Sequence, residues 1–344
     1  MVKKVLVIST SRSTRGGITS VVKSHEQCEF WNKYGCYWLE THIDSTIKNK
    51  LLIFVKSLFK FYTIFLRYDI FHVHLSEPSS LVRKCFYIFP AFFARKKIII
   101  HFHSFSPETT IKSRFKPLYY IVFKLSSKVV VLSPYWKKIV QNSLGGNIDV
   151  NVIYNPCMPV NTPILNFKEN SILFAGTLNQ RKGFVDLIKA FSNLKNSENW
   201  KLKFAGNGNI ELGKQIAREN GVEHNVEFLG WVKNEEKTAN FSSASVFCLP
   251  SYAEGFPMAI LDALAYELPI ITSDVGGVPD LFEHGLNALI FKPGDLTMLT
   301  QNLEIIIGSK ELRTKLAQNA SMLKNKHFSK KVVNKAIIEL YEEV

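Results

Sequence analysis

The chain has 344 residues, of which 46% are hydrophobic and 21% are charged, a balance that excludes a disordered protein and favours two globular domains. Residues 1–155 hold 23 Lys/Arg against 8 Asp/Glu, whereas residues 156–344 hold 20 against 21, so the formal charge of +14 belongs to the first half. That half should face an acidic partner. The five cysteines are scattered without metal-type spacing, which favours a reducing, cytoplasmic compartment.

The sequence predicts neither a signal peptide nor a transmembrane helix. The opening apolar run, residues 2–8, is too short for a signal peptide and leads into a glycine loop, so it is predicted to be a strand. The best candidate for a membrane span, residues 51–71, is interrupted by Lys56, Lys60 and Arg67.

Short apolar runs alternate with helical patterns along the chain, which is typical of parallel α/β sheets. Strands are predicted at residues 4–9, 70–74, 97–103, 128–132 and 150–154, and then at 171–175, 200–205, 226–229, 246–249 and 270–272. Prolines and asparagines without periodicity predict a linker over residues 158–170. We therefore expect two doubly wound domains, residues 1–156 and 157–308. A helical segment, residues 309–344, follows them and could return to the first domain.

The most informative segment is residues 250–279. It predicts a strand end, a loop containing Glu254, a helix with Pro257 in its first turn and Asp262 further along, and a second strand with a second glycine loop. Free backbone N–H groups at such a helix start, together with the helix dipole, can bind a diphosphate. A cradle of this kind between two acids suits a ligand with both phosphate and hydroxyl groups, such as a nucleotide-sugar.

Two further loops carry residues suited to phosphate. Arg181 and Lys182 follow a predicted strand; alone they fit a solvated basic loop, but beside the cradle they are better interpreted as phosphate ligands. Arg15, Gly16 and Gly17 follow the first strand. That loop matches neither the dinucleotide fingerprint nor the phosphate-binding loop, although paired glycines let a ligand approach the backbone.

Two His-x-His pairs, His72/His74 and His101/His103, end predicted strands, and each pair shares one face. A four-histidine metal site is one interpretation, but no acid or cysteine completes a familiar ligand set. Packing and hydrogen bonding explain His72 and His101 better, whereas His103 is predicted to point into a cleft.

Basic and aromatic residues interleave over residues 48–67, 83–97 and 112–128. We interpret them as a surface for an anionic membrane. Nucleic-acid binding, and apolar core faces with solvated lysines, are the alternatives.

Together these motifs resemble the retaining glycosyltransferases of the GT-B fold, specifically the GT4 family, glycosyl transferases group 1. The resemblance is carried by residues 174–183, 204–208, 226–232 and 250–279, and it extends over nearly the whole chain. It implies two Rossmann-like domains facing across a cleft, with the acceptor on the first and a nucleotide-sugar donor on the second. It also implies no cofactor and no metal, with a UDP-sugar favoured over a GDP-sugar.

The resemblance implies a role for each matching residue. Glu254 would contact the donor sugar, and Asp262, one carbon shorter than the family's usual Glu, would hold the ribose. Arg181 and Lys182 would bind the diphosphate, and His103 would lie near the reacting sugar. The remaining residues are assigned to phosphate contact (Gly255, Phe256, Met258), the base (Trp231, Val232), the donor loops (Gly206) and an acceptor or phosphate loop (Arg15, Gly16, Gly17).

The expected function is transfer of a hexosyl or N-acetylhexosaminyl group to a saccharide or lipid-linked acceptor of a cell-envelope polysaccharide, such as capsule, O-antigen or exopolysaccharide. We expect a cytoplasmic protein that is peripherally bound at the inner face of the plasma membrane. We expect no nucleic-acid partner. A GT-B nucleotide-sugar epimerase and a non-catalytic membrane-associated scaffold are the alternatives.

Overall fold

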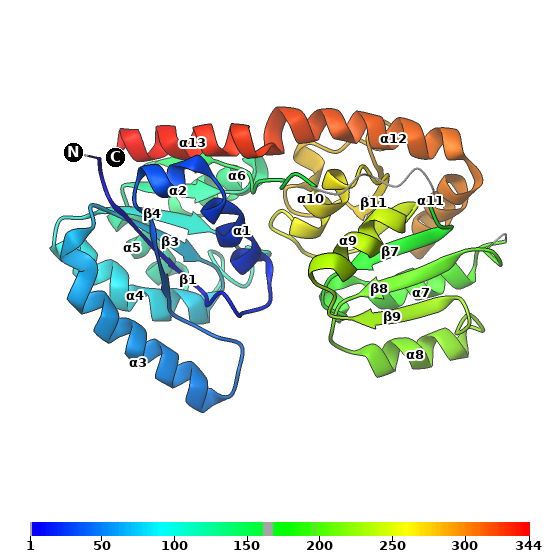
Figure 1. Cartoon of the computed structure of the whole chain (residues 1–344), viewed down its shortest axis with the longest axis horizontal. Helices are drawn as coiled ribbons and strands as arrows, with labels where there is room; N and C mark the ends of the chain where they lie inside the picture. The colour runs from blue at the N-terminus through cyan, green and yellow to red at the C-terminus, as the bar shows by residue number, and fades with distance from the viewer. Residues whose placement is uncertain (1, 161–167, 196) are drawn as a thin grey trace. The chain divides into compact units, whose positions relative to one another are not determined.

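The computed structural model describes residues 2–160, 168–195 and 197–344, so residues 161–167 of the predicted linker lie outside the described part. The chain divides into two compact units, Met1–Pro156 with Lys330–Val344 and Cys157–Ser329 (Figure 1). The described residues of each unit form a six-stranded sheet in which every neighbouring pair of strands is parallel. We call them the N-terminal unit and the C-terminal unit.

The sheet of the N-terminal unit has the strand order β2-β1-β3-β4-β5-β6. Its strands are β1 (Val5–Ser9), β2 (Tyr37–Glu40), β3 (Ile70–Leu75), β4 (Lys97–Phe102), β5 (Lys128–Val131) and β6 (Val150–Val152). Its helices are α1 (Gly17–Glu26), α2 (Glu29–Lys33), α3 (Ile47–Ile64), the 3-10 turn η1 (Phe65–Arg67), α4 (Pro78–Phe93), α5 (Lys116–Leu125), α6 (Pro134–Leu144) and α13 (Lys330–Glu343).

Alternation along the strands sorts this unit into two cores, because successive side chains point to opposite faces of a sheet. Leu6 and Ile8 belong to a core with buried residues of α3, α4, α5 and α6. Val5 and Val7 belong to a second core with buried residues of α2 and α13. The last helix of the chain therefore packs on the sheet that the first residues begin.

The sheet of the C-terminal unit has the order β12-β11-β10-β7-β8-β9. Its strands are β7 (Ser171–Ala175), β8 (Lys201–Ala205), β9 (Val226–Gly230), β10 (Val246–Leu249), β11 (Ile270–Ser273) and β12 (Leu289–Phe291). Its helices are η2 (Gln180–Lys182), α7 (Phe184–Ser192), α8 (Ile210–Glu219), α9 (Asn234–Ser243), α10 (Met258–Ala265), η3 (Val278–Asp280), α11 (Leu296–Gly308), α12 (Lys310–Leu323) and the π-helical turn η4 (Lys324–Phe328).

The two predicted parallel sheets are confirmed, and each of the ten predicted strands is present. Sequence analysis missed β2 and β12, which have four and three residues. Among the described helices, none combines the length and the apolar composition needed to cross a membrane.

Candidate functional site

The strand order of the C-terminal unit places two predicted loops side by side. β7 has β8 on one side and β10 on the other, so the chain reverses its direction of winding between β7 and β10. Ligands of open α/β sheets bind at such a switch point, at the carboxyl ends of the strands. The loop after β7 carries Arg181 and Lys182, and the loop after β10 carries Glu254.

These two loops meet through a buried ion pair. Lys182 Nζ donates to Glu254 Oε1 at 2.5 Å across 72 positions of sequence, and Arg181 Nη1 lies 3.4 Å from Glu254 Oε2. The Glu254 side chain is only 8% exposed. Its burial favours the neutral acid, but the charges of Lys182 and Arg181, together with the hydrogen bond from Lys182, outweigh this and hold the pKa of Glu254 below its ordinary value. The site thus holds an ionised carboxylate between two cations, with net positive charge.

The backbone fixes the geometry of this cluster. Asn179 Oδ1 accepts a hydrogen bond from Lys182 N at 3.1 Å, and Arg181 O accepts one from Tyr252 N at 2.7 Å. Arg181 Nη1 also donates to Ala253 O at 2.7 Å. The β7 and β10 loops are therefore held together by main-chain as well as side-chain bonds, which keeps the cations in place before any ligand arrives.

Glycines let the loops after β7, β8, β10 and β11 approach one another at this edge of the sheet. A Cβ at Gly183 would lie 2.0 Å from Pro250 O, and one at Gly206 would lie 1.8 Å from Gly176 O. A Cβ at Gly276, where φ is +57°, would lie 2.0 Å from Glu254 O. Gly277 N also donates to Gly255 O at 2.9 Å. Predicted donor-loop residue Gly206 thus acts by permitting close contact between loops.

Helix α10 begins beside the ion pair. Its first residue is Met258, and Pro257 is the capping residue before it, one position earlier than the predicted first turn. No side-chain hydrogen bond caps this end. Gly255 and Phe256 are buried and Met258 is half-buried. The positive end of the helix dipole adds to the charge of Arg181 and Lys182, so the predicted anion cradle lies where the cations lie.

Asp262, the second predicted acid, is paired with a residue that sequence analysis did not find. Its Oδ1 accepts from Lys237 Nζ of α9 at 2.7 Å, and the Asp262 side chain remains 31% exposed. Burial raises the pKa of Asp262, and Lys237 partly offsets the rise. Lys237 stands in no motif, so no local signal could have revealed it.

Trp231 and Val232 directly follow β9, as expected for residues at the same edge of the sheet. Trp231 is 39% exposed and Val232 is half-buried. Because β8 lies between β7 and β9, the strand spacing separates the β9 and β7 ends by roughly 10 Å.

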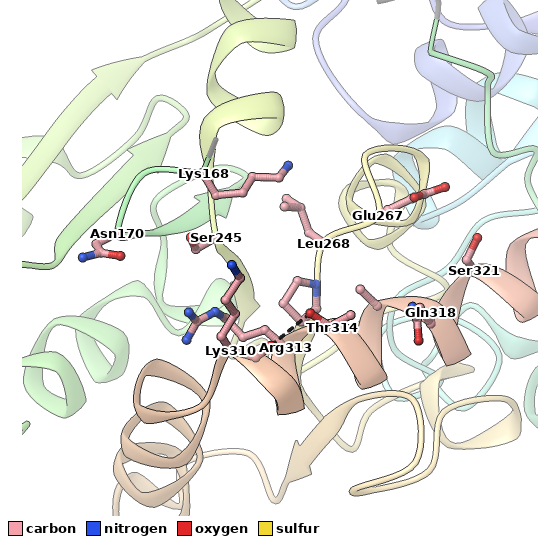
Figure 2. Close-up of a pocket in the computed structure, with 12 residues that line it drawn as sticks. Lys168, Asn170, Ser245, Glu267, Leu268, Lys310, Arg313, Thr314, Gln318 and Ser321 are labelled. Atoms are coloured by element: carbon pink, nitrogen blue, oxygen red, sulfur yellow. Dashed lines mark hydrogen bonds between the residues drawn. The ribbon is translucent and has the colours of Figure 1, made fainter. Parts of the chain in front are cut away.

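A cavity of about 710 Å³ lies at the opposite end of this sheet. Its lining includes Asn170, Ser245 and Pro269, each directly before a strand, and Lys310 and Arg313 of α12 (Figure 2). Arg313 Nη1 donates to Ile306 O and Ile307 O, the final carbonyls of α11. Arg313 therefore serves a helix end, and the motifs described above gather at the other edge.

The predicted N-terminal loop residues also lie at a switch point, because β1 has β2 on one side and β3 on the other. Gly16 is exposed, has a φ of +147° and caps α1, which begins at Gly17; Arg15 is exposed beside it. A Cβ at Gly16 would meet no atom within 4 Å. The backbone is thus open to a ligand there.

The four predicted histidines join His25 in one stacked cluster on the sheet face covered by α13. His74 Nδ1 and His103 Nε2 lie 2.9 Å apart, His72 Nε2 and His101 Nδ1 lie 3.1 Å apart, and His72 Nδ1 lies 2.6 Å from the Tyr341 hydroxyl. His103, expected to point into a cleft, is half-buried and stacks on His101 with ring centroids 4.3 Å apart.

One ring nitrogen each of His72, His74 and His101 lie within 4.8 Å of one another, which is close enough for the three side chains to hold a metal ion. Hydrogen bonds already join His72 to His101 and His74 to His103, and burial lowers the pKa of each histidine. A cluster of neutral, mutually bonded rings explains the geometry without an ion. Sequence analysis missed His25, which no motif marks.

Acid should destabilise the N-terminal unit through this cluster. Burial lowers the pKa of His25 and of His103 to about 3, and lowers the pKa of His72, His74 and His101 well below 6.5. The unfolded chain therefore binds more protons than the folded one below pH 6.5, so stability present above that pH is lost as pH falls toward 3.

Each histidine that is protonated in the unfolded chain and neutral in the folded chain makes the unfolding free energy fall by about 1.4 kcal/mol per pH unit of acidification. Urea unfolding followed at pH 7.5 and pH 5.5 measures this slope, and His25→Phe, which removes one buried imidazole, should reduce it. Equal unfolding free energies at both pH values would contradict the prediction.

Residues 162–322 match the family described as Glycosyl transferases group 1. This stretch, a little under half of the chain, belongs to that family. A glycosyltransferase of Haemophilus influenzae is 26% identical over 62% of this chain and 61% of its own length. An α-1,4-N-acetyl-D-galactosaminyltransferase of Campylobacter jejuni, named for its GalNAc-α-(1→4)-GalNAc-α-(1→3)-diNAcBac-PP-undecaprenol substrate, is 31% identical over 50% of this chain and 48% of its own. The chain thus spans about half to three fifths of the length of the curated relatives that it matches.

A solved structure confirms the fold of the whole chain. Anabaena Alr3699/HepE in complex with UDP-glucose aligns with a TM-score of 0.81 over 99% of this chain and all of that one, at 18% identity. The two parallel sheets are therefore those of the GT-B fold, as the sequence predicted.

Proposed function

We propose that the chain is a retaining glycosyltransferase that moves a sugar from a nucleotide diphosphate donor to an acceptor hydroxyl. The observation that carries the proposal is the Glu254–Lys182–Arg181 cluster at the β7/β10 switch point. Family membership supports the reaction class, and the UDP-glucose bound by HepE supports a UDP-sugar as the donor. Transfer of a hexosyl group is consistent with the UDP-glucose of HepE, and transfer of an N-acetylhexosaminyl group is consistent with the name of the Campylobacter relative.

The reaction breaks the bond between the anomeric carbon and the phosphate oxygen, forms a bond from that carbon to the acceptor oxygen, and releases the acceptor proton. Negative charge grows on the leaving diphosphate. Lys182, Arg181 and the start of α10 are fixed before the reaction, so they stabilise this charge more in the transition state than in the bound donor. The α10 amides near Gly255, Phe256 and Met258 would contact phosphate oxygens.

Glu254 has two tasks in this proposal. Its carboxylate holds Lys182 at 2.5 Å, and it presents an ionised acceptor toward the donor sugar. On the other unit, His103 would lie near the reacting sugar and the Arg15-Gly16-Gly17 loop would contact the acceptor or a phosphate. Among the described residues, no group of three potential metal ligands lies at the Glu254 cluster.

The acceptor class is a saccharide or lipid-linked saccharide of an envelope polysaccharide, used by a peripheral protein at the inner face of the plasma membrane. The undecaprenol-linked substrate in the name of the Campylobacter relative supports a lipid-linked acceptor. The excess of 23 Lys/Arg over 8 Asp/Glu in residues 1–155 supports an acidic acceptor environment.

The test is ligand-induced thermal stabilisation with UDP, GDP and ADP, followed by transfer assays with the matching sugars. A nucleotide that binds only the folded chain raises its melting temperature. Stabilisation by none of the three would reject the proposal. Incubation of the donor without acceptor separates a GT-B epimerase, which would convert the sugar alone.

Asp262→Ala should weaken donor binding more than it slows transfer. In this proposal Asp262 holds the ribose, away from the bond that breaks, so its hydrogen bonds act equally in the ground and transition states. Loss of a hydrogen bond to a charged group costs about 1.5–3 kcal/mol, which predicts a rise in donor KM of roughly tenfold to a hundredfold with kcat nearly unchanged. Lys237→Ala, which removes the partner of Asp262 but not the carboxylate, is the matched comparison. A fall in kcat with unchanged KM in Asp262→Ala would place the residue elsewhere.

A further inference from the structure

Helix α3 carries an apolar stripe on its solvent-exposed face. Six side chains, spaced four, four, four, three and four residues apart and continuing into η1, are between 55% and 85% exposed: Ile47, Leu51, Val55, Phe59, Tyr62 and Leu66. This spacing places them on one side of the helix. The opposite side supplies the buried residues Ser57, Phe61 and Ile64. Figure 1 shows α3 along the outside of its unit, beside α4.

The stripe is wider than one helix. Phe54, on the flank of α3, packs its ring against Phe86 of α4 with centroids 5.4 Å apart, and Phe86 is itself 51% exposed. Val82, one turn earlier on α4, is 44% exposed. We call these eight exposed side chains, the six of the stripe with Val82 and Phe86, the α3 surface. Apolar side chains gathered in this way mark an interaction site, whereas singly scattered ones do not.

The charge around the α3 surface has one sign. Residues 45–68 contain five cations, Lys48, Lys50, Lys56, Lys60 and Arg67, and no acid. Lys56 and Lys60 follow Val55 and Phe59 by one residue each, so helix geometry sets them roughly 100° around from the stripe. An exposed apolar face bordered by cations is the arrangement of helices that lie in a membrane interface.

We propose that the α3 surface docks on a bilayer that contains anionic lipid, with α3 lying in the interface and its stripe inserted. The occupant follows from the chemistry: the stripe needs an apolar phase, and the cations along its border need negative charge beside that phase. A bilayer surface supplies both. The use of this docking rests on the proposed function, because a lipid-linked acceptor stays at the membrane, but the docking itself needs no transfer.

Vesicle sedimentation of the full chain tests the proposal, with vesicles of phosphatidylcholine alone or mixed with phosphatidylglycerol. Wild type should sediment with the mixed vesicles and not with phosphatidylcholine alone, and salt at about 0.5 M should release it by screening the cations. Leu51→Gln/Phe59→Gln should weaken binding at least about tenfold through lost insertion. Lys56→Glu/Lys60→Glu should weaken it at least about tenfold through lost attraction.

Matched controls come from the C-terminal unit. Ile305→Gln/Met322→Gln removes two apolar side chains that are 53% and 66% exposed on α11 and α12, and Lys189→Glu/Lys195→Glu reverses two exposed cations. Both should bind vesicles as wild type does. Since all eight positions lie on the surface, each variant should melt near the wild-type temperature.

Equal binding by all variants, or no binding by wild type, would overturn the proposal. So would self-association in sedimentation velocity that Leu51→Gln/Phe59→Gln abolishes while wild type ignores vesicles, because the surface would then join two copies of the chain. The failure of the proposed function has a different signature: α3 variants should keep nucleotide-induced thermal stabilisation, whereas Lys182→Ala should lose it and keep vesicle binding.

Discussion

Lys182→Ala should abolish most sugar transfer while leaving the chain folded. In the proposed reaction Lys182 stabilises the charge of the departing diphosphate, and loss of one such preorganised group costs roughly 10²–10³ in kcat. The effect should exceed that of any other single substitution on turnover, since Lys182 also fixes Glu254 through the 2.5 Å contact. Release of nucleotide diphosphate, measured with donor and acceptor at saturation, reports the change.

The same substitution has a cost in stability that must be separated from the cost in rate. The Glu254 side chain is 8% exposed in the wild type, and without Lys182 its carboxylate keeps Arg181, at 3.4 Å, as its cationic partner. A buried acceptor that loses its partner costs about 1–3 kcal/mol, so a lowered melting temperature is expected as well. Assays therefore belong well below the melting temperature of the variant.

Two matched variants complete this experiment. Glu254→Gln keeps the shape of the side chain and an oxygen that can accept from Lys182, but removes the negative charge; transfer should fall with little loss of stability. Lys214→Ala removes a surface lysine of α8 whose side chain bonds Glu211 of the same helix, and should leave both rate and stability unchanged. Wild-type turnover in both Lys182→Ala and Glu254→Gln would reject the glycosyltransferase assignment of these residues.

Gly276→Ala should strongly destabilise the C-terminal unit. The added Cβ would lie 2.0 Å from Glu254 O and 2.8 Å from Gly255 O, and neither is the end of a flexible side chain. The loop that carries Glu254 would have to move, at an expected cost of about 3 kcal/mol or more. Nucleotide binding should be lost together with stability.

Gly221→Ala is the matched control, because Gly221 has a similar positive φ of +70° but an added Cβ would meet no atom within 4 Å. Its expected cost is only about 1 kcal/mol, from the backbone conformation alone. The difference between the unfolding free energies of the two variants in urea separates the cost of the steric clash from the cost of the backbone conformation. Equal destabilisation would mean that the contact between the β11 and β10 loops is not tightly packed.

Local patterns predicted the parts of the fold that local chemistry decides. Apolar runs such as Phe247 to Leu249 mark strands because both faces of a parallel sheet are buried. The glycine loops and the two cations after β7 could also be predicted, because each of these motifs lies within a single loop. Strands β2 and β12 were missed, and their length alone does not explain this, because β6 is as short as β12 and was predicted.

Contacts between distant segments escaped the sequence analysis. Lys237 pairs with Asp262 from a different helix, and His72 bonds Tyr341 across 269 positions. Nothing near either residue in the sequence announces its partner, because the strand order and the helix packing decide which segments meet. The same limit explains why His103 was expected in a cleft: its neighbour His74 comes from the adjacent strand, and the stack exists only once β3 and β4 are paired.

The return of α13 to the N-terminal sheet bears on how the chain is made. The ribosome delivers the C-terminal unit, Cys157–Ser329, as one uninterrupted stretch, so its core can close as soon as it emerges. The N-terminal unit is begun first but lacks Val333, Ile337, Leu340 and Tyr341 until α13 has been synthesised. During translation, the sheet face beside the five histidines therefore stays exposed to solvent until α13 packs on it. We expect a chaperone that acts on nascent chains to bind this exposed apolar face.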